Sequence, residues 1–137
     1  QPVNWLILTL KGDYVYTKNF SSDSPLPLTP PAKNIAEIKF QKDNFGGFFN
    51  PYFLFGLKFV SKAYQTGELE ASTPAYNIFN TGFGFDYMLK NSVASFDFEV
   101  TNLFNIKYTD HLSRYRYYAM NAGRSFNLKV NIPFEVK

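Results

Sequence analysis

The segment 106–124 carries the densest mixture of side chains that could bind a ligand. It holds the single histidine of the chain, His111, which is followed by Arg114, Tyr115 and Arg116 and by two further tyrosines. Guanidinium groups form charge-assisted hydrogen bonds with anions, and aromatic rings stack on ligands. The pattern predicts ligand binding, for example of a ferric chelate, by His111, Arg114, Tyr115 and Arg116. The alternative is an ordered loop whose tyrosines pack on the rim of the fold.

Other kinds of site find little support in the residue types. The chain has no cysteine and one histidine, which excludes disulfides, thiolate metal sites and cysteine nucleophiles and nearly excludes histidine-based metal clusters. Asp97 and Glu99 have the spacing of a carboxylate pair, but no apolar pocket is evident to raise either pKa. We therefore expect no enzyme activity, no catalytic residue, no metal site and no cofactor.

Gly82 and Gly84 form a Gly-x-Gly pair that superficially suggests phosphate binding. The pair lies inside an expected strand and opens no helix. We interpret these glycines as room for a neighbouring backbone or side chain inside a curved sheet.

Length and charge limit the classes of protein further. The chain has 137 residues, enough for one domain, and 14 Lys plus Arg against 11 Asp plus Glu give a net charge of +3 without a basic block. Nucleic acid is therefore not an expected partner. No apolar run is long enough for a transmembrane helix, although a transmembrane strand stays possible. The first residue is Gln, so we expect any targeting signal to lie outside this sequence and the chain to be a section of a longer protein.

Alternation of apolar and polar residues predicts an all-β fold. From 125 to 134 the even positions are apolar and most odd positions are polar, the period of a strand. Similar patterns predict about six strands and no helix. In the third of them we expect Phe49 and Phe53 on the same apolar face. The six expected strands span 5–17, 34–42, 48–62, 76–88, 94–101 and 125–134.

The polar faces of these strands carry charges of both signs. They could line a ligand path or contact another part of the protein. The alternative is a water-facing wall with ion pairs between neighbouring strands. The charged residues are Lys11, Asp13, Glu37, Lys39, Lys58, Asp86, Asp97, Glu99 and Lys129.

Connection lengths favour a membrane barrel over a soluble sandwich. The connections 18–33, 63–74 and 106–124 are long, whereas 43–47 and 89–92 are tight turns rich in Asp, Asn, Gly and Lys. In an antiparallel up-and-down meander all long loops then lie at one end, as in outer-membrane barrels. Strands of about thirteen residues, tilted near 45°, would also span a bilayer core of about 30 Å.

The C-terminal third resembles the end of TonB-dependent outer-membrane receptors. The most specific match is Asn102-Leu-Phe-Asn-x-x-Tyr108, within the run from Val100 to Tyr108. It is followed by Asp110-His-Leu-Ser113 and Gly123-Arg124 before a last alternating strand. Upstream, the proline-rich run 25–31, Glu70 and Thr73-Pro-Ala-Tyr76 match the order of landmarks in that family, so the resemblance covers essentially the whole chain.

The resemblance implies a 22-stranded barrel with a plugged lumen, of which residues 1–137 would be the C-terminal portion. It implies uptake of a scarce nutrient, such as a ferric siderophore, haem, cobalamin or an oligosaccharide, across the outer membrane of a Gram-negative bacterium. The expected partners are outer-membrane lipid, the rest of the barrel and its plug, the nutrient, and the TonB complex through parts outside this sequence. The plug and the TonB-contacting segment have no counterpart here, and Glu135, Val136 and Lys137 follow the terminal aromatic Phe134 where many members end.

Two alternatives remain open. A soluble all-β ligand-binding module would use the Phe-rich face as a dry core. A passive porin-like channel would share the barrel but lack the plug.

Overall fold

The computed structural model describes residues 4–90 and 92–133. Within these residues the chain forms strands and connections and no helix, so no helix is long and apolar enough to cross a membrane. The strands are β1 (Leu6–Asp13), β2 (Lys33–Gln41), β3 (Asn44–Phe45), β4 (Phe48–Val60), β5 (Tyr76–Met88), β6 (Val93–Thr101) and β7 (Ser125–Asn131). The predicted all-β class is confirmed.

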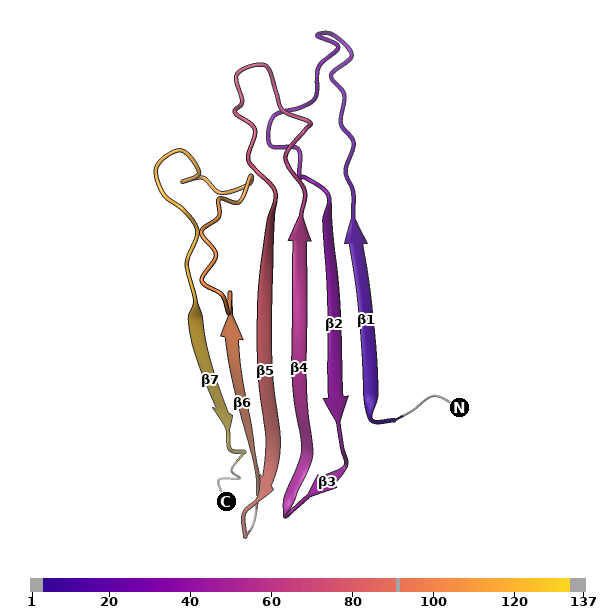
Figure 1. The fold of residues 1–137 in the computed structure, drawn as a ribbon, viewed down its shortest axis with the longest axis vertical. Coiled ribbons are helices and arrows are strands. Elements are labelled where there is room, and N and C mark those ends of the chain that lie inside the picture. Colours follow the sequence, from indigo (N-terminus) through magenta and orange to yellow (C-terminus); the bar gives the residue numbers. More distant parts are fainter. Residues whose placement is uncertain (1–3, 91, 134–137) are drawn as a thin grey trace.

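All seven strands belong to one antiparallel sheet. Its order is β1-β2-β4-β5-β6-β7, and the short β3 pairs only with β4. Apart from β3, strands adjacent in the sheet are also consecutive along the chain. The sheet is open, because β1 and β7 each pair with one neighbour. The three long connections lie together at one end and the short turns at the other (Figure 1). The expected up-and-down meander and the sorting of its loops are therefore confirmed, with seven strands in place of six.

The extra strand and the strand ends differ from the prediction. β3 lies within the expected turn 43–47, where Gly46 and Gly47 adopt positive φ angles of 58° and 90° that let β3 fold back on β4. β5 has its predicted span 76–88, whereas β4 ends at Val60 and not at 62, and β1 ends at Asp13 and not at 17. The expected length of about 13 residues is found in β4 and β5, and the other long strands have 7 to 9. The expected end of the last strand at Phe134 lies outside the described residues, as do Glu135, Val136 and Lys137.

A β-bulge overturns the expected placement of Phe49. Between Phe49 and Tyr52 the register of β4 against β5 shifts, so that β4 uses one residue more than β5. Asn50 takes a positive φ of 48° at this point. Because side chains alternate, one extra residue exchanges the two faces. Phe48 therefore packs edge-on against Phe85, with ring centroids 4.7 Å apart, and Phe49 lies opposite Asp86 on the polar face.

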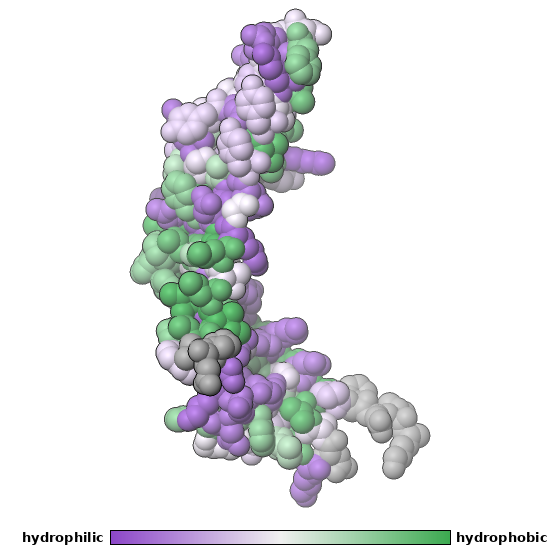
Figure 2. Space-filling model, turned by 90° about the vertical axis from the view of Figure 1, so that its right-hand side faces the viewer, coloured by the Kyte–Doolittle hydropathy of each residue, from purple (hydrophilic) through white to green (hydrophobic). Residues whose placement is uncertain are grey.

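One face of the sheet is apolar, and within residues 4–90 and 92–133 no other layer covers it. Its aromatic side chains contact one another between strands, as in the ring pairs Phe83–Phe98 and Phe85–Phe96. Leu10 and Leu128, at the two edges, are 70% and 71% exposed. Figure 2 shows the hydrophobic side chains gathered at mid-height between hydrophilic ends. The buried apolar cluster is small and lies at the loop end, where Val60, Tyr76 and Ile78 pack with Tyr108.

The opposite face is polar and contains the ion pairs expected from the sequence. Lys33 Nζ lies 2.9 Å from Asp13 Oδ2, and Lys11 Nζ lies 3.9 Å from Glu37 Oε2. Both pairs join β1 to β2, in neighbouring or opposing register positions. The interpretation of this face as a set of cross-strand pairs is therefore confirmed for these four residues.

Gly84 makes room for a side chain that crosses the sheet. Tyr52 of β4 extends over β5 and donates a hydrogen bond of 2.7 Å to Asp97 Oδ1 of β6. A Cβ atom built at Gly84 would lie 2.5 Å from Tyr52 Cε1 and 2.8 Å from the carbonyl oxygen of Phe96. Gly82 leaves similar room for the backbone of Phe98, whose carbonyl oxygen would lie 3.1 Å from an added Cβ. The expected role of the Gly-x-Gly pair is confirmed.

Gly84→Ala should destabilise the sheet. The added methyl group meets both a ring and a backbone oxygen, so overpacking should lower the free energy of unfolding by about 1–3 kcal/mol. Denaturant unfolding of the full-length polypeptide in detergent measures this change. Gly56→Ala is the matched control, because its nearest atom is the flexible Glu37 side chain at 3.6 Å. Equal unfolding midpoints for the two variants would contradict the steric explanation.

Candidate functional site

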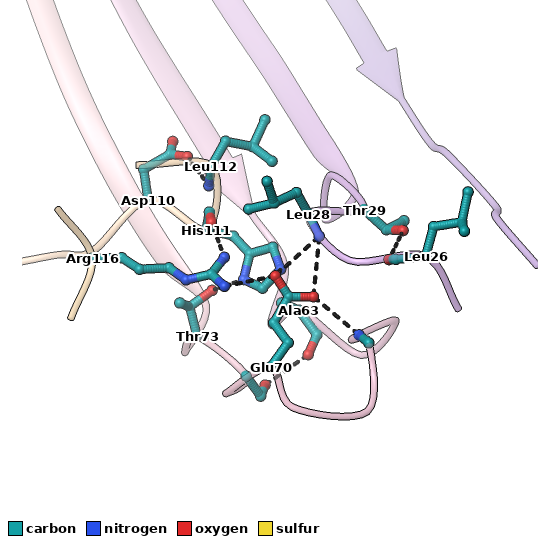
Figure 3. A network of polar contacts seen from close by, with 12 residues as sticks. Leu26, Leu28, Thr29, Ala63, Glu70, Thr73, Asp110, His111, Leu112 and Arg116 are labelled. Atoms are coloured by element: carbon teal, nitrogen blue, oxygen red, sulfur yellow. Dashed lines mark hydrogen bonds and ion pairs between the residues drawn. The ribbon is translucent and has the colours of Figure 1, made fainter. Parts of the chain in front are cut away.

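A buried polar cluster connects the three long loops at one end of the sheet. We call it the loop clasp and define it as Glu70, Thr73, His111 and Arg116 (Figure 3). Glu70 and Thr73 come from the β4–β5 connection, and His111 and Arg116 come from the β6–β7 connection. The clasp reaches the β1–β2 connection through the backbone of Leu28. Segments far apart in sequence therefore meet at one carboxylate.

Glu70 is the centre of the loop clasp. Its carboxylate accepts hydrogen bonds from the backbone N–H groups of Leu28, at 3.0 and 3.1 Å, and Gly67, at 3.0 Å. Its Oε1 also lies 2.6 Å from Nη2 of Arg116, and the side chain is only 5% exposed. Burial favours the protonated acid, but the hydrogen bonds from Gly67, Arg116 and Leu28 outweigh it and lower the pKa of Glu70. The group is therefore a buried, ionised carboxylate with several donors.

Arg116 holds Glu70 from the side of the third loop. Its guanidinium also donates to the carbonyl oxygen of His111 and, at 2.9 Å, to the hydroxyl of Tyr117. Burial favours the neutral guanidine, but the hydrogen bond to Glu70 outweighs it and raises the pKa of Arg116. The side chain is 8% exposed. Arg116 therefore carries a positive charge and connects the β6–β7 connection to the β4–β5 connection.

His111 is enclosed completely, with no exposed side-chain surface. Its Nδ1 lies 3.2 Å from the hydroxyl oxygen of Thr73, and its Nε2 lies 3.5 Å from Glu70 Oε1 without a hydrogen-bond partner among the described residues. Burial, supported by the charge of Arg116, lowers the pKa of His111 despite the nearby carboxylates of Glu70 and Asp110. We assign the neutral tautomer in which Thr73 donates to Nδ1 and the Nε2–H faces Glu70.

The Asn-Leu-Phe-Asn motif forms the turn that sends the chain from β6 into the third loop. Asn102 and Asn105 both adopt left-handed conformations, with φ of 52° and 54°. The side chain of Asn102 both donates to the carbonyl oxygen of Ile106 and accepts from its N–H, each at 2.8 Å. The Phe104 ring packs edge-on against Phe79 at 5.0 Å. Asparagine suits such turns because its short side chain satisfies the backbone locally.

Asp110 fixes the next part of this loop. Its Oδ2 accepts a hydrogen bond of 2.8 Å from the hydroxyl of Tyr76, and its Oδ1 accepts one of 2.9 Å from the N–H of Leu112. The ring of Tyr76 packs on Tyr108, with centroids 4.5 Å apart. The loop therefore folds back over β5, and this brings His111 to the β4–β5 connection.

The structure separates the four residues predicted to bind a ligand. His111 and Arg116 are buried in the loop clasp, whereas Arg114 and Tyr115 are exposed. Ligand binding by the four stays a prediction, and in this conformation only Arg114 and Tyr115 offer their side chains to solvent. Packing on the rim, the alternative for the tyrosines of this segment, is observed for Tyr108 and not for Tyr115, Tyr117 and Tyr118.

Sequence reasoning did not identify Glu70 as the partner of His111 and Arg116. Glu70 stood out only as a landmark of the resemblance, and it lies 46 residues from Arg116. The alternation of apolar and polar residues carries no signal for contacts between loops. Among the described residues no group of three potential metal ligands is present, and the loop clasp itself combines a carboxylate with its own guanidinium partner.

Comparisons with models of protein families, with curated proteins and with solved structures found no match for this chain. The chemistry of the loop clasp must therefore be judged from its geometry. The lowered pKa of Glu70 keeps this carboxylate ionised, and the lowered pKa of His111 keeps the imidazole neutral. Both side chains are buried. The arrangement suits holding three loops in place.

Replacing Arg116 should loosen the three loops together. In Arg116→Met, Glu70 keeps its backbone donors but loses its counter-charge, so local opening should become easier by about 3 kcal/mol, or roughly a hundredfold. Hydrogen exchange at the N–H groups of Leu28 and Gly67 measures the change. Arg114→Met, on the exposed side of the same loop, is the control and should leave exchange unaltered. Loosening of the third loop alone would contradict the coupling.

Acid should open the loop clasp. The pKa of Glu70 is lower in the folded state than in the unfolded state, so its ionised form stabilises the fold at any pH above the unfolded-state pKa. This stabilisation is lost as the pH falls through the folded-state pKa. The lowered pKa of His111 acts in the same direction, because stability is complete above the ordinary value of 6.5 and declines below it. Exchange protection at Leu28 should fall from neutral pH downward.

His111→Gln provides the control for this pH dependence. With Glu70 as the remaining titrating group of the loop clasp, the loss of protection should begin at a lower pH than in the unaltered protein. Protection that stays constant from neutral to acid pH, or that increases, would show that the charge state of the clasp does not hold the loops.

Proposed function

We propose that this chain is a section of the wall of an outer-membrane β-barrel, the C-terminal portion of a TonB-dependent receptor. The whole protein would take up a scarce nutrient, such as a ferric siderophore, haem, cobalamin or an oligosaccharide, across the outer membrane of a Gram-negative bacterium. The section would supply strands that contact lipid, a polar lining and three loops on the outer side. The plug, the remaining strands and the contact with the TonB complex would come from other parts of the protein.

The exposed apolar face of the sheet carries this proposal. It extends across every long strand, and its exposed members are large. A soluble sandwich covers such a face with a second sheet, so that inner side chains interdigitate. A membrane barrel covers it with lipid and keeps its polar face toward the lumen. The exposed side chains include Leu8, Leu10, Ile38, Phe40, Phe53, Phe59, Phe83, Phe126, Leu128 and Val130.

The open edges and the sorted loops support the same proposal. Among the described residues, β1 and β7 each leave one row of backbone groups without a strand partner, and such edges can pair with further strands. In a larger barrel the preceding strands would pair with β1, and the first strands would close on β7. The long connections share one end with the loop clasp, and the tight turns share the other. Outer-membrane barrels have long extracellular loops and short periplasmic turns.

The choice of a receptor over a passive channel rests on the resemblance of the Asn102–Tyr108 run to TonB-dependent receptors. The turn formed by this run gives the resemblance a physical basis, because its two left-handed asparagines end β6 and start the third loop. A porin-like channel would need the same wall but no such partner as TonB. The polar lining, with charges of both signs, suits contact with water in either case.

The test places an environment-sensitive dye on each face of the sheet. Residues 1–137 contain no cysteine, so single cysteines introduced there can be labelled with a nitrobenzoxadiazole group once any cysteines elsewhere in the full-length polypeptide are replaced by serine. Leu8→Cys and Leu128→Cys probe the apolar face at the two edges. Thr9→Cys and Asn127→Cys, one position away, are matched controls on the polar face. In vesicles containing brominated lipid, we expect quenching of the two apolar-face probes and no quenching of the controls.

Other patterns of quenching lead to other functions. Absence of lipid quenching at all four positions would reject the barrel and favour the soluble binding module. Quenching as expected, without cross-linking of the full-length protein to TonB in intact cells, would keep the barrel and favour the passive channel.

A further inference from the structure

Among the described residues, Lys58 of β4 forms no ion pair, unlike Lys11 and Lys33 on the same face of the sheet. Its register neighbours on β2 and β5 are Ile35 and Ile78, whereas Lys11 and Lys33 face carboxylates. Within residues 4–90 and 92–133 no carboxylate forms an ion pair with Lys58, whose ammonium lies 5.8 Å from the centre of the Tyr76 ring. A half-buried cation between two isoleucines is therefore available to an anion.

Lys58 lines a cavity of about 540 Å3 at the loop end of the polar face. The sheet side of the cavity includes Lys33, Lys58 and Val60, and the loops contribute prolines 30 and 31 and Leu112. Two of its walls adjoin the loop clasp, because Leu28 precedes the prolines and His111 precedes Leu112. The clasp thereby holds the walls of the cavity in place.

The other charged residues of this cavity have partners of their own, and Asp110 keeps its negative charge because its partners are neutral. Asp13 is paired with Lys33 at 2.9 Å, and the two oxygens of Asp110 accept hydrogen bonds from Tyr76 and Leu112. Lys58 remains as the single charge without an opposite charge or a hydrogen-bond partner among the described lining residues. Around it the walls are apolar, from Val15, Val60, the two prolines and Leu112.

We propose that this cavity binds a small organic anion with an apolar body, whose anionic group pairs with Lys58 and whose body packs on Val60, Leu112 and the prolines. The inference rests on the proposed function in one respect, because it requires the polar face to border the water-filled interior of a barrel. It adds the chemical class of the ligand and the residue that recognises its charge. An ammonium in a partly desolvated site discriminates an anion from a neutral molecule of the same shape.

A second cavity shows why Lys39 is the matched control. Lys39 lies on the same face near the turns, stacked over the Tyr52 ring at 4.4 Å. The cavity that it lines, about 320 Å3 in volume, also contains Lys42 and the carboxylates of Asp43, Asp86 and Asp97, so carboxylates outnumber lysines there, whereas they equal lysines in the first cavity. An anion would be repelled there, so the loss of Lys39 should leave binding at Lys58 intact.

The experiment compares phenylacetate with phenylacetamide, a neutral molecule of nearly the same shape. Equilibrium dialysis against the full-length protein in lipid nanodiscs gives both dissociation constants. We expect phenylacetate to bind with a constant of about 1 mM or below, and at least about tenfold more tightly than phenylacetamide. Lys58→Gln should abolish this preference. Lys58→Arg, which keeps the charge, and Lys39→Gln should retain it.

Three results would overturn the inference. They are equal affinity for the two probes in the unaltered protein, a preference that survives in Lys58→Gln, and absence of saturable phenylacetate binding. Lipid quenching measured on the same preparations separates the two proposals. Quenching without the preference rejects only the ligand assignment, and the preference without quenching rejects the barrel while leaving the cavity as an anion site.

Discussion

A single-layer sheet cannot cover its own apolar face, and the rest of this structure depends on that constraint. The large side chains of β1 to β7 contact one another sideways, as Phe98 does with Phe83 and Phe126, but their outer surfaces are open. At about 25 cal/mol per Å2 of apolar surface removed from water, the covering medium contributes a large share of stability. The hydrogen-bonded strand pairs and the alternation of apolar and polar residues therefore specify the fold. Its free energy of unfolding depends on the medium that covers the apolar face.

On the polar face and at the loop end, networks of hydrogen bonds and ion pairs hold the chain in place of a hydrophobic core. Tyr52 spans the gap at Gly84 to reach Asp97, and Glu70 collects donors from three connections. Both arrangements join strands or loops that are not neighbours in sequence. Because Glu70 is buried, each missing donor would leave part of a charge uncompensated, so its partners are strongly interdependent.

The sequence alone predicted the features that follow from local chemistry. Alternation identified β5 with its full span and β4 from its first residue to within two residues of its end, and turn residues located the two short connections. It failed at the bulge, because a single extra residue at Asn50 reverses the faces without altering composition, and Phe49 was assigned to the apolar face as a result. It also failed at the loop clasp, since the meeting of Glu70 with His111 depends on how the third loop folds back over Tyr76. Patterns along one strand carry no information about such a path.

The bulge in β4 has a consequence for how this sequence can change over evolutionary time. In most of the ladder a single-residue insertion or deletion would move a row of phenylalanines to the charged side, so changes in length there must come in pairs or fall in the loops. At Asn50 the odd residue is already accommodated, by a left-handed backbone and by a hydrogen bond of 2.9 Å from Asn50 Nδ2 to Asp86. Loss of one residue at this point would remove the bulge and leave both ends of β4 on the faces that they now occupy, because Phe48 and Phe53 already share the apolar face. Related sequences should therefore keep constant spacing on either side of the bulge and tolerate the loss of one residue at the bulge itself.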